Sequence, residues 1–137
     1  KIINQTKNTR INSLSSLFDL EHIKILSVED NYSNQKVIHK MLTEIGIHNK
    51  NITCLCDGIN FIENIEANNR YDIVFIDLKM PRLNGIEATK ELQKKKLKKN
   101  MFFVAITATV TDNTIKECFS IGMDANSSFN DFVSFPH

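Results

Sequence analysis

The feature that most restricts the fold is a short apolar run that ends at a carboxylate. It reads Tyr71-Asp-Ile-Val-Phe-Ile76, and Asp77 follows directly. The run is rich in β-branched and aromatic residues, which predicts a strand. Because it is almost wholly apolar rather than alternating, we expect both of its faces to be buried, as in the central strands of a parallel sheet.

Strand and helix patterns alternate along the chain from residue 23 onward. Besides the apolar run, strands are predicted at 23–28, 51–56 and 101–106, and helices near 34–45, 59–65, 84–97 and 112–121. We expect Ser33 to cap the first of these helices and Gly46 to end it. Strands that alternate with helices at this spacing predict an α/β domain, a parallel sheet with helices on both faces.

Charge gives little reason to expect a nucleic acid or a membrane as partner. The 137 residues are 42% hydrophobic and 24% charged, with a formal net charge of +1, so the whole chain is not attracted to polyanions. The one charge run, Lys94-Lys-Lys-Leu-Lys-Lys99, falls at the end of a predicted helix, where cations favour the helix dipole. No aromatic residue interleaves it, which favours a solvated helix end over a nucleic-acid patch.

Cysteine usage and the absence of long apolar runs favour a cytoplasmic domain. Cys54, Cys56 and Cys118 are an odd number and do not suggest a disulfide framework, so we expect buried free thiols in a reducing compartment. No apolar run approaches the roughly 18 residues of a membrane span, and no signal peptide is readable.

Three of the predicted strands end in polar residues: Glu29 and Asp30, then Asp77, then Thr107. In a parallel sheet these ends lie along one edge, so three carboxylates and a hydroxyl are expected in one crevice. Clustered carboxylates raise each other's pKa unless a cation neutralises them, and oxygen ligands suit Mg²⁺, which often shares its shell with a phosphate. The residues therefore predict a Mg²⁺ site that handles a phosphoryl group, with Asp77 as nucleophile and Thr107 as hydrogen-bond donor.

These motifs resemble the receiver domain of two-component response regulators. Residues 25–37, Ile-Leu-Ser-Val-Glu-Asp-Asn-Tyr-Ser-Asn-Gln-Lys-Val, resemble more narrowly the receivers of hybrid sensor histidine kinases. The resemblance covers about residues 23–125 and implies a flavodoxin-like, doubly wound sheet of five parallel strands. Pro81 and Gly85 match the Pro and Gly of the family's acceptor loop. Thr107, which lies 30 residues after Asp77, matches the family's switch hydroxyl, and Ala108 matches the small residue that follows it.

The resemblance also implies roles. Asp77 matches the phosphoacceptor and Thr107 the switch hydroxyl. Asp30 is expected to bind Mg²⁺ directly, Glu29 largely through water, and Lys79 through its backbone carbonyl. The phosphate would come from a histidine kinase or a histidine phosphotransfer protein. The domain would be a self-catalysed phosphoacceptor rather than an enzyme with a free substrate, without contact to nucleic acid or membrane, and its oligomeric state stays open.

The chain departs from the family's pattern near its end. The family's Lys position falls on Phe129, the Pro position after it on Asn130, and the aromatic switch position on Asn126. No Lys or Arg occurs after Lys116. An ammonium at the Lys position pairs with the acceptor carboxylate and then with the phosphoryl oxygens, so its loss predicts slower phosphotransfer or an uncoupled readout. Lys79 is an alternative source of a cation.

The predicted domain spans 21–129, between an N-terminal flank at 1–20 and a tail at 130–137. Eight residues are marginal for a helix, so the family's last helix is expected to be short or missing. In the flank, apolar residues at helical spacing predict a short helix near 11–19 that is a candidate to cover the exposed sheet face: Ile11, Leu14, Leu17 and Phe18.

Three functions are left open. The intact acids and hydroxyl favour a phosphoaccepting receiver. The missing Lys and the short tail favour a degenerate receiver that acts as a phosphorylation-independent interaction module. Magnesium-aspartate chemistry alone also fits a small-molecule phosphohydrolase, although the chain has no cap domain to enclose a substrate. A phosphate adduct on Asp77 separates the first two, and rapid multiple-turnover phosphate release identifies the third.

Overall fold

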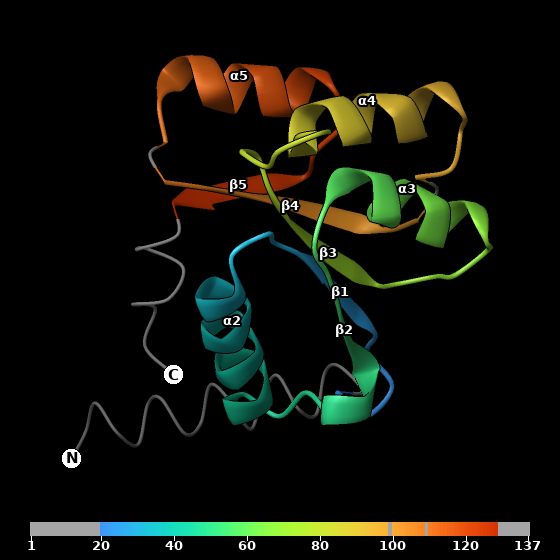
Figure 1. Ribbon diagram of the computed structural model, residues 1–137, viewed down its shortest axis with the longest axis vertical. Helices are drawn as coiled ribbons and strands as arrows, with labels where there is room; N and C mark the ends of the chain where they lie inside the picture. Colours follow the sequence, from blue (N-terminus) through green and yellow to red (C-terminus); the bar gives the residue numbers. More distant parts are fainter. Residues whose placement is uncertain (1–19, 99, 109, 129–137) are drawn as a thin grey trace.

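The computed structural model describes residues 20–98, 100–108 and 110–128, in which helices cover both faces of a five-stranded sheet (Figure 1). All neighbouring strands are parallel, in the order β2-β1-β3-β4-β5. This confirms the predicted doubly wound, flavodoxin-like sheet. The strands are β1 (Ile25–Val28), β2 (Ile52–Leu55), β3 (Ile73–Asp77), β4 (Phe102–Thr107) and β5 (Ala125–Ser128). The described helices are α2 (Tyr32–Glu44), α3 (Gly58–Glu66), α4 (Gly85–Lys94) and α5 (Asp112–Ser120), with a short 3-10 helix at Asn49–Asn51.

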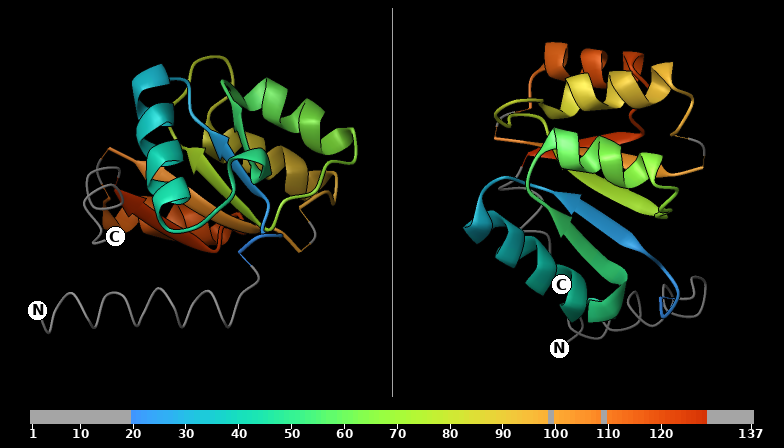
Figure 2. Two further views of the ribbon diagram at one scale, coloured as in Figure 1. Left: turned by 90° about the horizontal axis from the view of Figure 1, so that it is seen from below. Right: turned by 45° about the vertical axis from the view of Figure 1, so that its right-hand side comes forward.

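Two apolar cores lie on the two faces of the sheet. Figure 2 shows α2 on one face and α3, α4 and α5 on the other. The larger packs α3, α4 and α5 against one face and includes the fully buried Phe61. The smaller packs α2 against the other face through residues such as Ile38. The central strand β3 serves both cores, since Val74 belongs to the larger and Phe75 to the smaller. This double burial explains why the run before Asp77 is almost wholly apolar.

Helix α2 begins earlier than predicted. Asn31, not Ser33, is its N-cap, and the Asn31 side chain accepts a hydrogen bond from the backbone N–H of Asn34 at 3.0 Å. Ser33 lies in the first turn of the helix and is exposed. The prediction was wrong because Asn and Ser are about equally good caps, so the sequence alone does not choose between them.

The cysteines only partly follow the prediction of buried thiols. All three are free and Cys118 is fully buried, but Cys54 and Cys56 are exposed. The prediction was wrong for these two because they lie in and just after β2, an edge strand with a neighbour on one side only. A strand pattern in the sequence does not reveal whether the strand lies at the edge or in the centre of a sheet.

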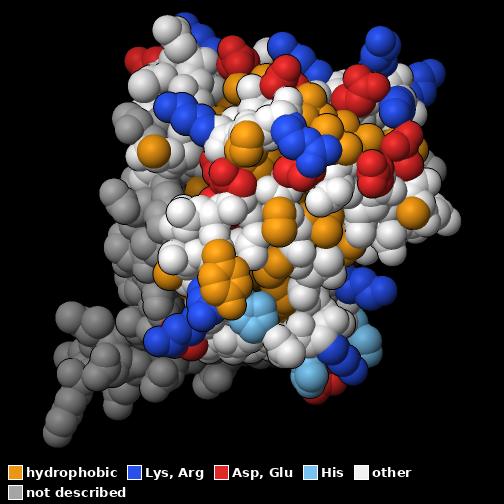
Figure 3. All heavy atoms as spheres, in the orientation of Figure 1, with side chains coloured by type: hydrophobic (Ala, Val, Ile, Leu, Met, Phe, Trp, Pro, Cys, Tyr) orange, Lys and Arg blue, Asp and Glu red, His pale blue; other side chains and the backbone are white. Residues whose placement is uncertain are grey.

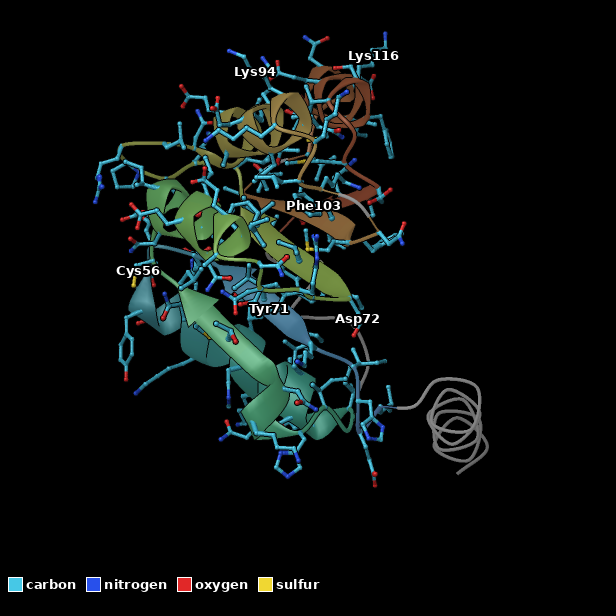
Figure 4. All side chains as sticks on the ribbon, turned by 90° about the vertical axis from the view of Figure 1, so that its right-hand side faces the viewer. Cys56, Tyr71, Asp72, Lys94, Phe103 and Lys116 are labelled. Atoms are coloured by element: carbon cyan, nitrogen blue, oxygen red, sulfur yellow. The ribbon has the colours of Figure 1, made fainter. Side chains whose placement is uncertain are left out.

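In the described part of the lysine run, Lys94, Lys95 and Lys96 are exposed, whereas Lys98 is not. Lys94 projects outward from α4 (Figure 4) and is exposed. The Lys98 side chain is only 12% exposed; its Nζ donates to Asp124 Oδ2 at 2.9 Å and lies 4.9 Å from the centroid of the Phe103 ring. Around α3, α4 and α5, Lys and Arg side chains are interspersed with Asp and Glu (Figure 3), so this face carries no patch of a single charge sign.

The predicted short or missing last helix falls on residues outside the described part of the chain. The last element that the structure describes is β5, and four helices accompany the five strands. The predicted helix near 11–19, with its apolar stripe, and the predicted tail at 130–137 lie outside the described residues. Within the described part of the chain, every helix is too short or too polar to cross a membrane.

Candidate functional site

Three strand ends meet at one pocket on the carboxyl edge of the sheet. The pocket has a volume of about 250 Å³ and is lined by Glu29 just after β1, Asp77 at the end of β3 and Thr107 at the end of β4. Because β1, β3 and β4 are neighbours in register, these ends lie side by side. The rest of the lining comes from Asn34, Lys79, Ile106 and Ala108.

The acidic residues form a compact cluster at this pocket. Glu29, Asp30 and Asp77 each offer a carboxylate oxygen, and these oxygens lie within 4.8 Å of one another. Glu29 is 3% exposed, Asp77 is half-buried and Asp30 is exposed. None of the ion pairs within the described residues involves them. Three oxygen donors without an ion-pair partner among the described side chains fit a hard divalent cation such as Mg²⁺.

Hydrogen bonds fix the two buried carboxylates. The backbone N–H of Asn31 donates to Glu29 Oε1 at 3.0 Å, and Asn34 Nδ2 donates to the same oxygen at 3.4 Å. The backbone N–H of Lys79 donates to Asp77 Oδ1 at 3.0 Å. The first turn of α2 and the loop after β3 therefore hold these side chains in place before any ligand arrives.

Burial and mutual repulsion make both buried acids hold their protons more tightly. Burial raises the pKa of Glu29 to about 7, and the nearby charge of Asp77 adds to this effect. Burial also raises the pKa of Asp77, and the charge of Asp30 contributes. Without a cation, the pocket therefore keeps a proton up to near-neutral pH, which is the expected behaviour of an unneutralised acidic site.

The metal-free protein should lose stability as the pH rises from 5 to 8. The folded-state pKa of Glu29 lies above its ordinary value of 4.5, so the folded state binds more protons than the unfolded state between the two values. The resulting stabilisation is complete below pH 4.5 and is lost as the pH rises through 7. The total fall in the free energy of unfolding is about 3 kcal/mol, most of it between pH 5 and 8. Urea denaturation in EDTA measures it. Glu29→Gln should flatten the dependence, and an equally steep fall in that variant would contradict this assignment.

Close backbone approaches hold the acceptor loop, residues 78–84 between β3 and α4. A Cβ built on Gly85 would lie 2.4 Å from the carbonyl oxygen of Asp77, far inside van der Waals contact. A Cβ on Gly58, the first residue of α3, would lie 2.3 Å from the carbonyl oxygen of Leu83. Both glycines therefore allow the loop to pack directly against the first turns of α3 and α4.

The structure adds three residues that the sequence did not single out for the site. Asn34 lines the pocket and bonds Glu29. Asp57 caps α3 and accepts a hydrogen bond from Arg82 Nη1 at 3.1 Å, which ties the acceptor loop to that helix. The Asp57-Gly58 pair before a helical pattern was a readable cap signal. Nothing in the sequence indicated Asn34 or Arg82, because their partners lie in other elements.

The predicted site residues have the following positions. Glu29, Asp30 and Asp77 come together, and Thr107 lines the same pocket. Lys79 also lines it, while the metal role of its carbonyl stays a prediction. Asn126 lies in β5 beside Ala105 of β4. Phe129 and Asn130 lie outside the described residues.

Sequence comparison connects this arrangement with a known family. The family model described as the response regulator receiver domain matches residues 25–126. The osmosensing histidine protein kinase SLN1 of Saccharomyces cerevisiae is 37% identical over 118 residues, which cover 83% of this chain and 9% of the kinase. Histidine protein kinase 1 of Candida albicans is 34% identical over 120 residues, which cover 82% of this chain and 5% of that protein. The chain thus spans less than a tenth of these relatives.

Solved structures show the same architecture. The receiver domain of the Pseudomonas aeruginosa sensor histidine kinase PA1611, solved with a magnesium ion coordinated in the active site cleft, has a TM-score of 0.66 and 32% identity. The structural match covers 77% of this chain and 84% of the PA1611 receiver chain. The Francisella response regulator 1452 receiver domain has a TM-score of 0.70 and 25% identity. This match covers 82% of this chain and 91% of the Francisella receiver chain.

Proposed function

Because the chain belongs to the response regulator receiver family, we propose that it accepts a phosphoryl group from a phosphohistidine onto Asp77. The observation that carries the proposal is the cluster of Glu29, Asp30 and Asp77 within 4.8 Å, in a pocket that Thr107 also lines. The nucleophilic carboxylate of Asp77, the Glu29 carboxylate and the Thr107 hydroxyl line a space large enough for a phosphoryl group, and Asp30 lies beside them. The pocket is open to a partner's side chain at the edge of the sheet.

The chain's own residues account for the transfer. The Lys79 N–H holds Asp77 Oδ1 at 3.0 Å, which orients the carboxylate. An Asp77 oxygen attacks phosphorus, a P–O bond forms, and the P–N bond to the donor imidazole breaks with its electron pair returning to that nitrogen. The Thr107 hydroxyl donates a hydrogen bond to a phosphoryl oxygen, which stabilises the charge that the group brings. Water later hydrolyses the acyl phosphate at the same pocket.

The donor set fits Mg²⁺, because it consists of oxygens only and the carboxylates lack a paired cation among the described side chains. Glu29, Asp30, Asp77 and the backbone carbonyl of Lys79 would hold the ion. When bound, it supplies positive charge that offsets the charge of the phosphoryl group and of the acids around it.

The relatives suggest the partner. They are histidine kinases of which this chain matches only a small part, so we propose a histidine kinase or a histidine phosphotransfer protein as the phosphate source. We place this relay in the cytoplasm, since the exposed Cys54 and Cys56 are free thiols, as is usual in a reducing compartment.

A degenerate receiver that works by docking is the second candidate. It is favoured by one observation, the absence of any Lys or Arg after Lys116, which removes the family's cation from its usual position. Such a protein keeps the fold and the acidic cluster but does not take up phosphate.

Chemical phosphorylation tests the proposal. The protein is incubated with acetyl phosphate and Mg²⁺ and measured by intact mass spectrometry. We expect one phosphoryl adduct that requires Mg²⁺ and is released by hydroxylamine, as acyl phosphates are. A folded protein that binds Mg²⁺ but gains no adduct would identify the degenerate receiver. Multiple-turnover release of phosphate would instead indicate a phosphohydrolase.

A further inference from the structure

Lys79 is the one cationic residue among the described residues that line the pocket. The backbone N–H of Lys79 donates a hydrogen bond to Asp77 Oδ1, which holds the Lys79 backbone beside the proposed acceptor. Its side chain is exposed and makes no ion pair within the described part of the chain. A flexible ammonium is therefore anchored beside a pocket that Glu29 and Asp77 line, with Asp30 close to both.

Several other described cations have partners elsewhere or lie away from the pocket. Arg82 pairs with Asp57, and Lys98 pairs with Asp124. Lys36 lies over the Tyr32 ring, with its Nζ 4.7 Å from the centroid. Lys116 lies on the outer side of α5, away from the strand ends (Figure 4). Among these, none lines the pocket.

We propose that the Lys79 ammonium contacts the phosphoryl oxygens during transfer and serves as the cation that this chain lacks near its end. The inference rests on the proposed phosphorylation of Asp77. It assigns Lys79 two separate contributions: its carbonyl toward the metal and its ammonium toward the phosphoryl group. Substituting the side chain leaves the carbonyl in place, so the second contribution can be removed alone.

Removing the Lys79 ammonium alone should have opposite effects on Mg²⁺ binding and on phosphorylation. A positive side chain beside the acidic cluster repels a divalent cation, so Lys79→Met should tighten Mg²⁺ binding, by about threefold for a partly solvated charge. The same change removes a donor that stabilises charge during transfer, so phosphorylation should slow by about tenfold. A variant that merely disturbed the loop would weaken both processes together.

The experiment compares Lys79→Met, Lys79→Arg and Lys116→Met, the last as a matched loss of one charge outside the pocket. Mg²⁺ affinity is measured by isothermal titration calorimetry, adduct formation from acetyl phosphate by intact mass, and binding of beryllofluoride, a phosphoryl analogue, by fluorine NMR. We expect Lys79→Met to slow phosphorylation and weaken beryllofluoride binding without weakening Mg²⁺ binding. Lys79→Arg should restore most of the rate, and Lys116→Met should behave as the wild type.

Other results would overturn the inference. A Lys79→Met rate within twofold of the wild type, an equal slowing in Lys116→Met, or a parallel loss of Mg²⁺ affinity would each do so. If the wild type itself neither forms an adduct nor binds beryllofluoride, the proposed function fails and the inference about Lys79 falls with it. An active wild type with an equally active Lys79→Met variant refutes only the role of Lys79.

Discussion

Replacing Asp77 with asparagine should abolish the phosphoryl adduct completely and at the same time stabilise the metal-free protein. The amide is a poor nucleophile toward phosphorus, so the acyl phosphate cannot form at this position. The change also removes one of three carboxylates that lie within 4.8 Å of one another, two of which have raised pKa values. Relief of this repulsion should raise the free energy of unfolding by about 1–2 kcal/mol at pH 8 in EDTA.

The matched control for this variant is Asp72→Asn. Asp72 precedes the same strand at its opposite end (Figure 4) and accepts a hydrogen bond from the backbone N–H of Lys24, which the asparagine oxygen can keep. This control should retain the adduct. Mass spectrometry and urea denaturation supply the two measurements. An adduct that persists in Asp77→Asn would place the phosphate on another residue and would refute the proposal that Asp77 is the acceptor.

Replacing Gly85 with alanine should destabilise the protein by about 3 kcal/mol, although alanine is the better helix former by about 1 kcal/mol. The added Cβ would lie 2.4 Å from the carbonyl oxygen of Asp77 and 3.1 Å from the Cα of Leu78, and both are backbone atoms that cannot rotate away. Either α4 or the end of β3 must shift. Because β3 ends at Asp77, we also expect phosphorylation and Mg²⁺ binding to weaken.

Lys90→Ala is the control, since Lys90 is exposed on the same helix and its replacement should change the free energy of unfolding by less than about 0.5 kcal/mol. Chemical denaturation of both variants, with Mg²⁺ calorimetry on the folded fraction, tests the prediction. An unchanged or increased stability of Gly85→Ala would mean that α4 can move away from β3 at little cost, and that the acceptor loop is not held by this contact.

Part of the candidate site was predictable because of a simple rule of parallel sheets. Asp77 and Thr107 are the last residues of β3 and β4, and Glu29 follows β1, so knowing where strands end was enough to place them in one crevice. The ion pair of Asp57 with Arg82 and the contact of Asn34 with Glu29 were not predictable. They join residues of different elements, and their geometry depends on how a loop and a helix pack against the sheet.

The sequence by itself determined the alternation of strands and helices, the burial of β3 on both faces and the identity of the acids at the strand ends. These follow from local patterns, since backbone hydrogen bonding and the period of apolar residues act over a few neighbours. Only the tertiary structure decided that Cys54 and Cys56 are exposed, that Asn31 rather than Ser33 caps α2, and that the pKa of Glu29 rises to about 7. The exposure of the two cysteines and the pKa of Glu29 depend on which residues from distant parts of the chain surround these side chains. The cap depends on where the helix begins, because Asn31 and Ser33 are about equally suitable as caps.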